Sequence, residues 1–145
     1  MPLDGEYAEE KTGWVADQLA KIDETGTTES VGINGMKVAV FTMRGAKSGK
    51  LRRVPLMRVE KDGVYAVVAS KGGAPENPAW YHNITANPEV EVLDGSASHD
   101  GVARELDGAE RDEWWALAVE TFPPYAEYQT KTSRQIPLLL VEPKN

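Results

Sequence analysis

The sequence predicts an α+β domain in which six short antiparallel strands form a small barrel with three or four helices around it. Two observations support this class. Short runs of branched and aromatic residues alternate with helix-like segments, and turn signals separate them. The first runs follow one another through tight turns, without the helical crossover that parallel strands need. The 145 residues fit one domain, with an N-terminal helix and loop at 1–36 and a core at 37–143.

The first element expected is a helix over residues 6–24. Apolar residues from Trp14 to Ile22 recur there at helical spacing, with charged residues between them. Residues 25–36 are rich in glycine, threonine, serine and asparagine, which predicts a loop before the first strand.

Three strands are expected next. Lys37–Arg44 is rich in residues that favour strands, and Leu51–Val59 predicts a second strand in which Pro55 marks an edge or a bulge. Asp62-Gly63 suits a tight hairpin, because both residue types tolerate a positive φ. It leads into a third strand, Val64–Ser70. Consecutive hairpins predict a meander of neighbouring strands.

A short helix is expected from Asn77-Pro78 to Ala86. Asparagine is a common N-cap, and proline is favoured at the first helical position. Two more strands follow at Val90–Leu93 and Ser98–Glu105, with the turn Asp94-Gly95 between them.

The C-terminal part is expected to hold a helix and a last strand. Asp107 to Glu110 has the spacing of a capping box, with aspartate as the cap, and an aromatic stripe follows until Pro123-Pro124 ends the helix. A short segment with two tyrosines then leads to the strand Ile136–Val141.

Charge is distributed unevenly along the chain. The net charge is -7, yet the stretch from Ser30 to Val59 has no acidic residue and carries +7, which leaves -14 elsewhere. Clustered cations repel one another unless an anion lies among them, so the stretch indicates an anion site. A solvated basic face is the simpler alternative. The acidic average argues against a general nucleic-acid or anionic-membrane binder.

Composition excludes several other classes of site. The absence of cysteine rules out disulfides, thiolate metal sites and a catalytic thiol, and His82 and His99 lack a second ligand at a metal-binding spacing. No serine-hydrolase elbow or complete phosphate loop is present. The longest late apolar run, Leu138–Val141, is far too short to span a membrane, and the acidic N-terminus does not resemble a signal peptide. We therefore expect a cytoplasmic protein without a metal, bound nucleic acid or stable membrane insertion.

The turn between the first two strands could hold an anion. Gly45 and Gly49 bracket it, so its backbone N–H groups are accessible, and Lys47 and Ser48 add a charge and a hydroxyl. Arg52 or Arg53 then follows on the next strand, where alternation lets only one of them share the ligand's face. An ordinary exposed hairpin tip would have a similar composition.

Two later blocks could complete a ligand site. The small residues of Ala69–Gly73 let a flat ring approach the backbone, and Asn77–Asn83 adds two aromatic rings and two amides. Tyr125 and Tyr128 share one face if their segment is helical, and their phenols could hydrogen-bond a substrate or supply a proton. Aromatic residues are more often part of a core, and the tyrosines would then be ordinary half-buried side chains.

In this order and spacing, the blocks resemble the deazaflavin-dependent nitroreductase family of coenzyme F420-dependent reductases. The resemblance runs from about Lys37 to Pro143 and is carried by Arg44–Gly49, Arg52–Leu56, Ala69–Ala74, Asn77–Pro88, Pro124–Gln129 and Arg134–Pro137.

The resemblance implies a split β-barrel of the flavin-binding type and coenzyme F420 as the cofactor. In its reduced form, F420H2, the cofactor would donate a hydride from ring carbon C5 to planar conjugated acceptors: quinones, enones, coumarin-like unsaturated lactones and nitro compounds. The implied cofactor-binding residues are Lys47, Ser48, Arg52 and Arg53 toward the anionic tail, Val54, Pro55, Leu56, Met57, Ala69, Ser70 and Lys71 along the ring, and Trp80, Tyr81 and Asn83 closing the groove.

The resemblance also implies that Tyr125 and Tyr128, with Ser70, border the substrate and act as catalytic residues. Either phenol, or water, could protonate the reduced product. Some family members have tyrosine where Met57 and Phe122 stand here, and this departure argues against nitroimidazole reduction. Two alternatives remain open: an FMN-binding oxidoreductase on the same barrel, and a non-catalytic carrier of a planar cofactor. The sequence leaves the choice between monomer and homodimer open.

Overall fold

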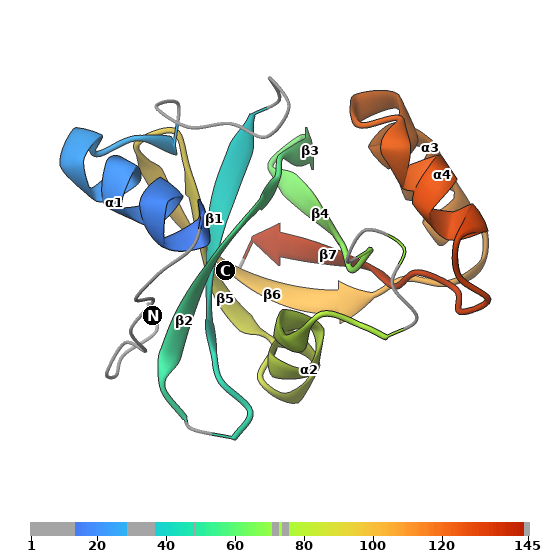
Figure 1. Ribbon diagram of the computed structural model, residues 1–145, viewed down its shortest axis with the longest axis horizontal. Coiled ribbons are helices and arrows are strands. Elements are labelled where there is room, and N and C mark those ends of the chain that lie inside the picture. Colours follow the sequence, from blue (N-terminus) through green and yellow to red (C-terminus); the bar gives the residue numbers. More distant parts are fainter. Residues whose placement is uncertain (1–13, 29–36, 48, 71–72, 74–75, 144–145) are drawn as a thin grey trace.

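The computed structural model describes residues 14–28, 37–47, 49–70, 73 and 76–143. Across these residues the chain forms one antiparallel sheet and four helices (Figure 1). In chain order the elements are α1 (Trp14–Thr25), β1 (Val38–Arg44), β2 (Leu51–Met57), β3 (Val59–Lys61), β4 (Val64–Val68), α2 (Ala79–Ala86), β5 (Glu89–Asp94), β6 (Ala97–Glu105), α3 (Gly108–Thr121), α4 (Pro124–Thr130) and β7 (Leu138–Pro143). The predicted helix over 6–24 is described from Trp14 onward, and most of the predicted loop lies outside the described residues.

The sheet curls because one chain segment supplies both of its edges. The strand order is β2-β1-β5-β6-β7-β4-β3, so β2 and β3 lie at opposite ends of it. In the chain, however, Arg58 alone separates them. The two edges must therefore approach each other at Arg58, and Figure 1 shows the strands wrapped around a common centre. The α+β class and a curled, barrel-like sheet are confirmed.

Two predictions about the strands were wrong. The described residues form seven strands, because the single strand expected at Leu51–Val59 changes partner at Arg58, from β1 to β4. The expected meander fails for the same reason, since the hairpins β1–β2 and β3–β4 lie at opposite ends of the sheet order. Pro55 lies in an edge strand, as predicted, and the β1–β2 register runs through it without a bulge.

Apolar side chains pack on both faces of the curled sheet. Its interior is filled by residues of β1, β4, β5 and β7, with Trp80 and Ile84 of α2 closing one end. On the outer face, Leu19 of α1 packs near Val40 of β1, and Figure 1 shows α1 and the α3–α4 pair on opposite sides of the molecule. The α3–α4 pair covers a second outer cluster that includes Tyr125. The helices thus cover the outer face on two sides, while α2 covers the interior.

The helix starts differ in detail from the predicted caps. Asn77 does not cap α2: the N-cap is Pro78, and the Asn77 side chain accepts a hydrogen bond from Arg134 instead. Asp107 is the N-cap of α3, as predicted, but its side chain makes no cap hydrogen bond. Glu110 does not complete a capping box either, because both of its carboxylate oxygens accept from Arg104. Among the described helices, none is long and apolar enough to cross a membrane.

Candidate functional site

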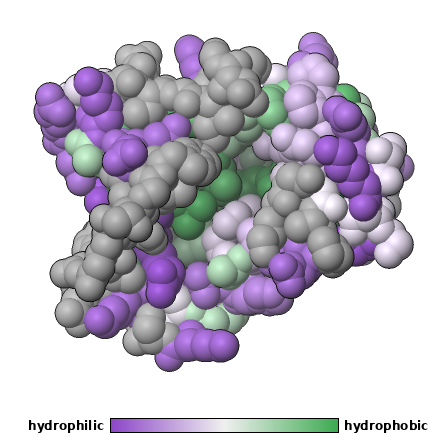
Figure 2. Space-filling model, viewed as in Figure 1, coloured by the Kyte–Doolittle hydropathy of each residue, from purple (hydrophilic) through white to green (hydrophobic). Residues whose placement is uncertain are grey.

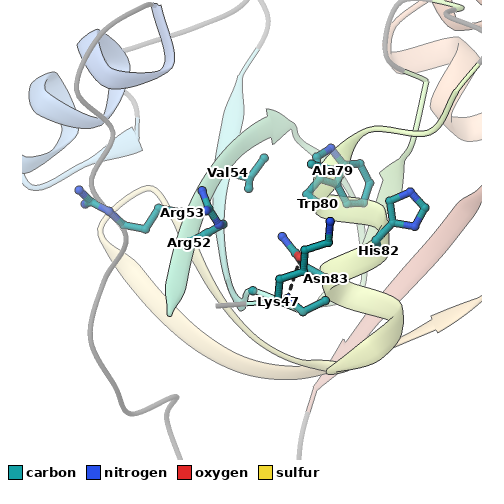
Figure 3. Close-up of a pocket in the computed structure, with 10 residues that line it drawn as sticks. Lys47, Arg52, Arg53, Val54, Ala79, Trp80, His82 and Asn83 are labelled. Atoms are coloured by element: carbon teal, nitrogen blue, oxygen red, sulfur yellow. Dashed lines mark hydrogen bonds between the residues drawn. The ribbon is translucent and has the colours of Figure 1, made fainter. Parts of the chain in front are cut away.

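A cavity of about 570 Å³ lies between the β1–β2 turn, strand β2 and helix α2. Figure 3 shows the side chains of β2 on one side of it and those of α2 on the other, with Lys47 between them. Its lining residues come from three separate parts of the chain: Gly45, Ala46 and Lys47 of the turn, Arg52, Arg53 and Val54 of β2, and Ala79, Trp80, His82 and Asn83 of α2.

The turn at Lys47 is held in place by its own backbone and by Arg44. The Gly45 N–H donates to the carbonyl of Lys50 at 2.8 Å, and the Gly49 N–H donates to the carbonyl of Gly45 at 3.1 Å. The Arg44 guanidinium donates to the carbonyl of Gly49 at 2.8 Å. Gly49 has a φ of +74°, a conformation that favours glycine. These bonds fix the turn, and the Lys47 side chain is exposed at its tip.

Helix α2 is tied to this turn. The N–H of Ala46 donates to Oδ1 of Asn83 at 2.9 Å across the cavity wall (Figure 3). The bond joins residues 37 positions apart, so it fixes how far the basic turn stands from α2. Asn83 was predicted to close a cofactor groove; in the structure it lines the cavity and binds the turn.

The two arginines of β2 lie on opposite faces of the strand. Arg53 pairs in register with Thr42, and its guanidinium donates to both carboxylate oxygens of Asp23 on α1, at 2.7 and 3.1 Å. The Arg53 hydrogen bond holds the pKa of the Asp23 carboxyl below its usual range. Arg52 pairs with Met43, a residue of the interior cluster, so its side chain starts from the inner face. Figure 3 shows the Arg53 side chain directed away from Lys47. Both arginines line part of the cavity, but Arg52 starts from the inner face of β2, whereas the Arg53 guanidinium is bound to Asp23.

Apolar groups form part of the cavity wall. Trp80 is 9% exposed and packs in the interior cluster, with Val54 against it. Figure 2 shows this face of the molecule hollowed at its centre, with a hydrophobic floor. A site with a basic turn at one end and an apolar floor suits a ligand that has an anionic tail and a flat, uncharged ring.

Strand alternation divides the four β2 residues predicted to line a ring. Val54 and Leu56 pack against the interior cluster. Met57 lies on the opposite face, in the cluster beneath α3 and α4. Pro55, two residues before Met57 in the strand, is on the same face as Met57. Val54 alone among them lines the described cavity. The side chains of Pro55 and Met57 therefore do not face the same space as those of Val54 and Leu56.

The predicted tyrosines lie in the outer cluster beneath α3 and α4. Tyr125 and Tyr128 do share a face of the helix α4, and their rings are 6.3 Å apart. Phe122 stacks edge-on against Tyr125 at 5.0 Å, and Met57 belongs to the same cluster. Burial raises the pKa of the Tyr125 phenol. Tyr125 is thus a neutral hydrogen-bond donor at ordinary pH, and neither tyrosine lines the cavity at Lys47.

The remaining predicted residues lie near one or the other region. Ala69 is fully buried in the interior cluster, and Ser70 follows it at the strand end, 8% exposed. The Tyr81 hydroxyl donates to Glu105 at 2.6 Å, and this bond raises the pKa of Tyr81 to about 12. Ser48 and Lys71 lie outside the described residues.

Sequence reasoning missed two residues of the cavity wall, Ala79 and His82. Both lie on α2, where Ala79 precedes His82 by three positions and Asn83 by four, so it shares a face with each of them. That spacing could have identified them once Asn83 was assigned to the groove.

A second polar cluster lies at the junction of β2 and β3. Arg58 donates to both oxygens of Asp94 at 2.9 Å, and the Tyr65 hydroxyl donates to Asp94 at 2.6 Å. Burial alone would raise the pKa of Asp94, but the bonds from Arg58 and Tyr65 outweigh it and hold the pKa below its usual range. The cluster joins β4 and β5, which are not neighbours in the sheet order, to the residue between β2 and β3. Among the described residues, no group of three or more acidic or histidine side chains could hold a metal ion.

Comparison with known proteins gives consistent matches. The sequence model of a family described as F420H(2)-dependent quinone reductase matches residues 14–143. Over 100 residues the chain is 35% identical to an F420H(2)-dependent quinone reductase of Mycobacterium tuberculosis, with 67% of each chain covered. It is 62% identical to a solved structure described as an F420-H2 dependent reductase, with a TM-score of 0.69 over 72% of this chain and 93% of that one. A structure described as a domain-swapped dimer is 58% identical, with a TM-score of 0.73 over 89% and 97%.

Proposed function

The chain belongs to the F420H(2)-dependent quinone reductase family, and from this membership we propose that it passes a hydride from reduced coenzyme F420 to a quinone. The membership confirms the resemblance to F420-dependent reductases that the sequence motifs indicate. It also makes the protein an oxidoreductase whose cofactor is coenzyme F420.

The observation that carries the proposal is the pairing of a basic turn with an apolar-walled cavity. Coenzyme F420 has a flat deazaflavin ring at one end and a phosphodiester with several carboxylates at the other. The cavity of about 570 Å³ offers Lys47 and Arg52 for the anionic end and Trp80 and Val54 for the ring. The residues present therefore fit the two ends of the cofactor.

We assign the anionic end of the cofactor to Lys47 and Arg52. The N–H groups of Gly45, Ala46 and Gly49 are already bonded within the protein, so the assignment rests on the two side chains, and we keep Ser48 in this set from the sequence motif. Arg53 has a different role in the proposal. Its bidentate bond to Asp23 holds α1 against β2, so it supports the wall without contacting the ligand.

We place hydride transfer at the ring end of the cofactor, away from its anionic end. When bound, reduced coenzyme F420 supplies the hydride from ring carbon C5. One hydride and one proton convert a quinone into a hydroquinone, so the protein must stabilise the oxyanion or deliver a proton to it. The Tyr125 and Tyr128 phenols, on the helix whose end lies against Gly73, are our candidates for that hydrogen bond, with Ser70 nearby in the chain. Water is the alternative proton donor.

We extend the proposed substrate class from quinones to other planar conjugated acceptors, namely enones and coumarin-like unsaturated lactones. Met57 and Phe122 stand in the tyrosine cluster where some relatives have phenols. Fewer donors there argue against nitro compounds, whose reduction builds more charge on oxygen. A substrate panel of menadione, a coumarin and a nitroimidazole tests this order.

A fluorescence titration with oxidised coenzyme F420 beside FMN tests the cofactor assignment. We expect saturable binding of coenzyme F420 and at least tenfold weaker binding of FMN; the reverse order would support an FMN oxidoreductase. Turnover of F420H2 with menadione then separates an enzyme from a carrier that only binds the cofactor. Binding without turnover of any acceptor in the panel would favour the carrier.

We also propose that the chain forms a homodimer in the cytoplasm. The support is the solved structure described as a domain-swapped dimer, which is 58% identical and 97% covered by this chain. Light scattering coupled to size-exclusion chromatography tests the assembly, and a monomeric mass at micromolar concentration would refute it.

A further inference from the structure

The guanidinium of Arg134 joins three acceptors on a distant part of the chain. Arg134 lies in the connection between α4 and β7, which passes close to the segment between β4 and α2 (Figure 1). Its Nη1 donates to the carbonyl of Ala69 at 3.1 Å and to Oδ1 of Asn77 at 2.7 Å. Its Nη2 donates to the carbonyl of Ser70 at 2.9 Å. One planar group thus binds both the end of the strand and Asn77, two residues before α2.

The backbone near Arg134 is itself anchored to α3 and α4. Gln129 of α4 donates from Nε2 to the Arg134 carbonyl at 2.8 Å, and its Oε1 accepts from the N–H of Ile136 at 3.0 Å. Arg111 of α3, 9% exposed, donates to the carbonyl of Ile136 at 2.7 Å. Arg134 therefore connects a backbone segment held by α3 and α4 to the strand end.

A second, independent contact joins the same two regions. Gly73 has a φ of +85° and donates its N–H to the Ser70 carbonyl at 2.9 Å. A Cβ at Gly73 would lie 2.8 Å from the carbonyl oxygen of Tyr128 and 3.0 Å from Cβ of Lys131. This close approach places the turn after Ser70 directly on the end of α4, the helix that carries both candidate tyrosines.

The other end of the Arg134 bridge leads to the cavity. Asn77, which accepts from Arg134, precedes α2 by two residues. Along that helix, Asn83 holds Ala46 of the basic turn at 2.9 Å. Arg134 therefore joins the connection that leaves α4 to the segment that leads into α2.

We propose that Arg134 is a positioning residue that sets the spacing between the cofactor wall and the tyrosine-bearing helix. The proposal rests on the proposed reductase function for its kinetic consequence. A guanidinium can satisfy three acceptors in fixed directions, whereas a lysine ammonium is a point charge on a more flexible stem. Loss of the bridge should therefore disturb the relative placement of the two reactants more than it disturbs the anion grip at Lys47.

The kinetic test compares Arg134→Ala and Arg134→Lys with Arg104→Ala. Arg104 is a matched control because it also makes several hydrogen bonds, to Glu110 and Glu142, but on β6 away from this junction. Both Arg134 variants should lower kcat with menadione about ten- to a hundred-fold, the size of effect that a displacement near 1 Å can cause. Their affinity for oxidised coenzyme F420 should change by less than about threefold. Arg104→Ala should leave both quantities within about twofold of wild type.

Chemical rescue separates positioning from a general loss of stability. Guanidinium ion at tens of millimolar should restore part of kcat in Arg134→Ala and none in Arg104→Ala, since a free guanidinium can reoccupy the vacated acceptors. A merely destabilised protein would regain no activity, because guanidinium does not stabilise a folded state. Unchanged kcat, or a parallel loss of kcat and affinity without rescue, would overturn the proposal.

Amide hydrogen exchange tests the bridge without any cofactor. Arg134→Ala should speed exchange in peptides covering Val64–Val68 and α2 while leaving β6 unchanged. Uniform acceleration, or none, would count against the bridge. If the wild-type protein fails to bind coenzyme F420, the proposed function fails, and this exchange experiment still decides the structural role of Arg134.

Discussion

Replacing Lys47 with alanine removes the charge that stands between β2 and α2 at the mouth of the cavity. A charge-assisted hydrogen bond contributes about 1.5–3 kcal/mol, which corresponds to roughly ten- to a hundred-fold in the dissociation constant. The Lys47 side chain is exposed, so solvent and salt screen it and the loss should lie toward the lower end of that range. Fluorescence titration with oxidised coenzyme F420 at two ionic strengths measures it.

The chain provides a close control in Lys50, which lies in the same turn and is also exposed, but is not among the residues that line the cavity. Lys50→Ala removes the same charge a few residues away and should weaken binding by less than about threefold, through long-range electrostatics only. Raising the salt should weaken wild-type binding more steeply than binding to Lys47→Ala. If Lys47→Ala binds within a factor of two of wild type, or no more weakly than Lys50→Ala, then the basic turn does not grip the cofactor.

Three further predictions concern the wall, the chemistry and the fold. Asn83→Ala removes the bond that holds the turn to α2 and should weaken cofactor binding about two- to tenfold; unchanged affinity would show that the turn keeps its place without it. Tyr125→Phe should lower kcat at least fivefold and leave cofactor affinity within about twofold, and wild-type turnover with three different acceptors would remove the phenol from the mechanism. The pKa of Asp94 is lowered, so its carboxylate stabilises the fold above its ordinary pKa of 3.8, and that stability is lost as the pH falls through the lower, folded-state value. Asp94→Asn should therefore be less stable to urea at neutral pH, and its free energy of unfolding should fall less between about pH 5 and pH 3 than that of wild type. An equal fall in both proteins over this pH range would contradict the assignment.

The strands could be predicted from residue type, but their partners could not. The run Leu51–Val59 has the composition of one strand, and the chain does continue in extended form through it. The change of partner at Arg58 depends on β5, β6 and β7 inserting between the two hairpins, and those strands lie far along the sequence. Because each hairpin forms locally while the sheet order is a property of the whole chain, local patterns predicted the hairpins correctly and their arrangement wrongly.

The predicted caps failed for a related reason: their polar side chains found partners elsewhere. Asn77 and Glu110 have the right residue types at the right spacings, but each accepts a hydrogen bond from an arginine brought in by the tertiary fold. A charged donor makes a stronger hydrogen bond than a backbone N–H, so the arginine wins the competition. A short motif predicts where a helix begins more reliably than it predicts what its side chains bind.

The basic stretch shows how far a charge pattern can identify a binding site. The fold itself uses several of these cations: Arg44 holds the turn, Arg53 binds Asp23 on α1, and Arg58 binds Asp94. Asp23 and Asp94 lie outside the acid-free stretch in the sequence. The tertiary structure therefore brings negative charge beside two of its arginines.

Lys47 and Arg52 differ from these arginines in their position. Both line one cavity, Lys47 from a turn and Arg52 from the inner face of a strand. The charge excess of the stretch is thus an upper limit on the charge available to a ligand. A phosphodiester and a short run of carboxylates need no more than two such cations and a few further hydrogen-bond donors to be held. Arg53 instead fastens α1 to β2, and Arg58 fastens the β2–β3 junction to β5. Removing the charge of Arg53 should therefore lower stability, whereas removing the charge of Lys47 should lower cofactor affinity.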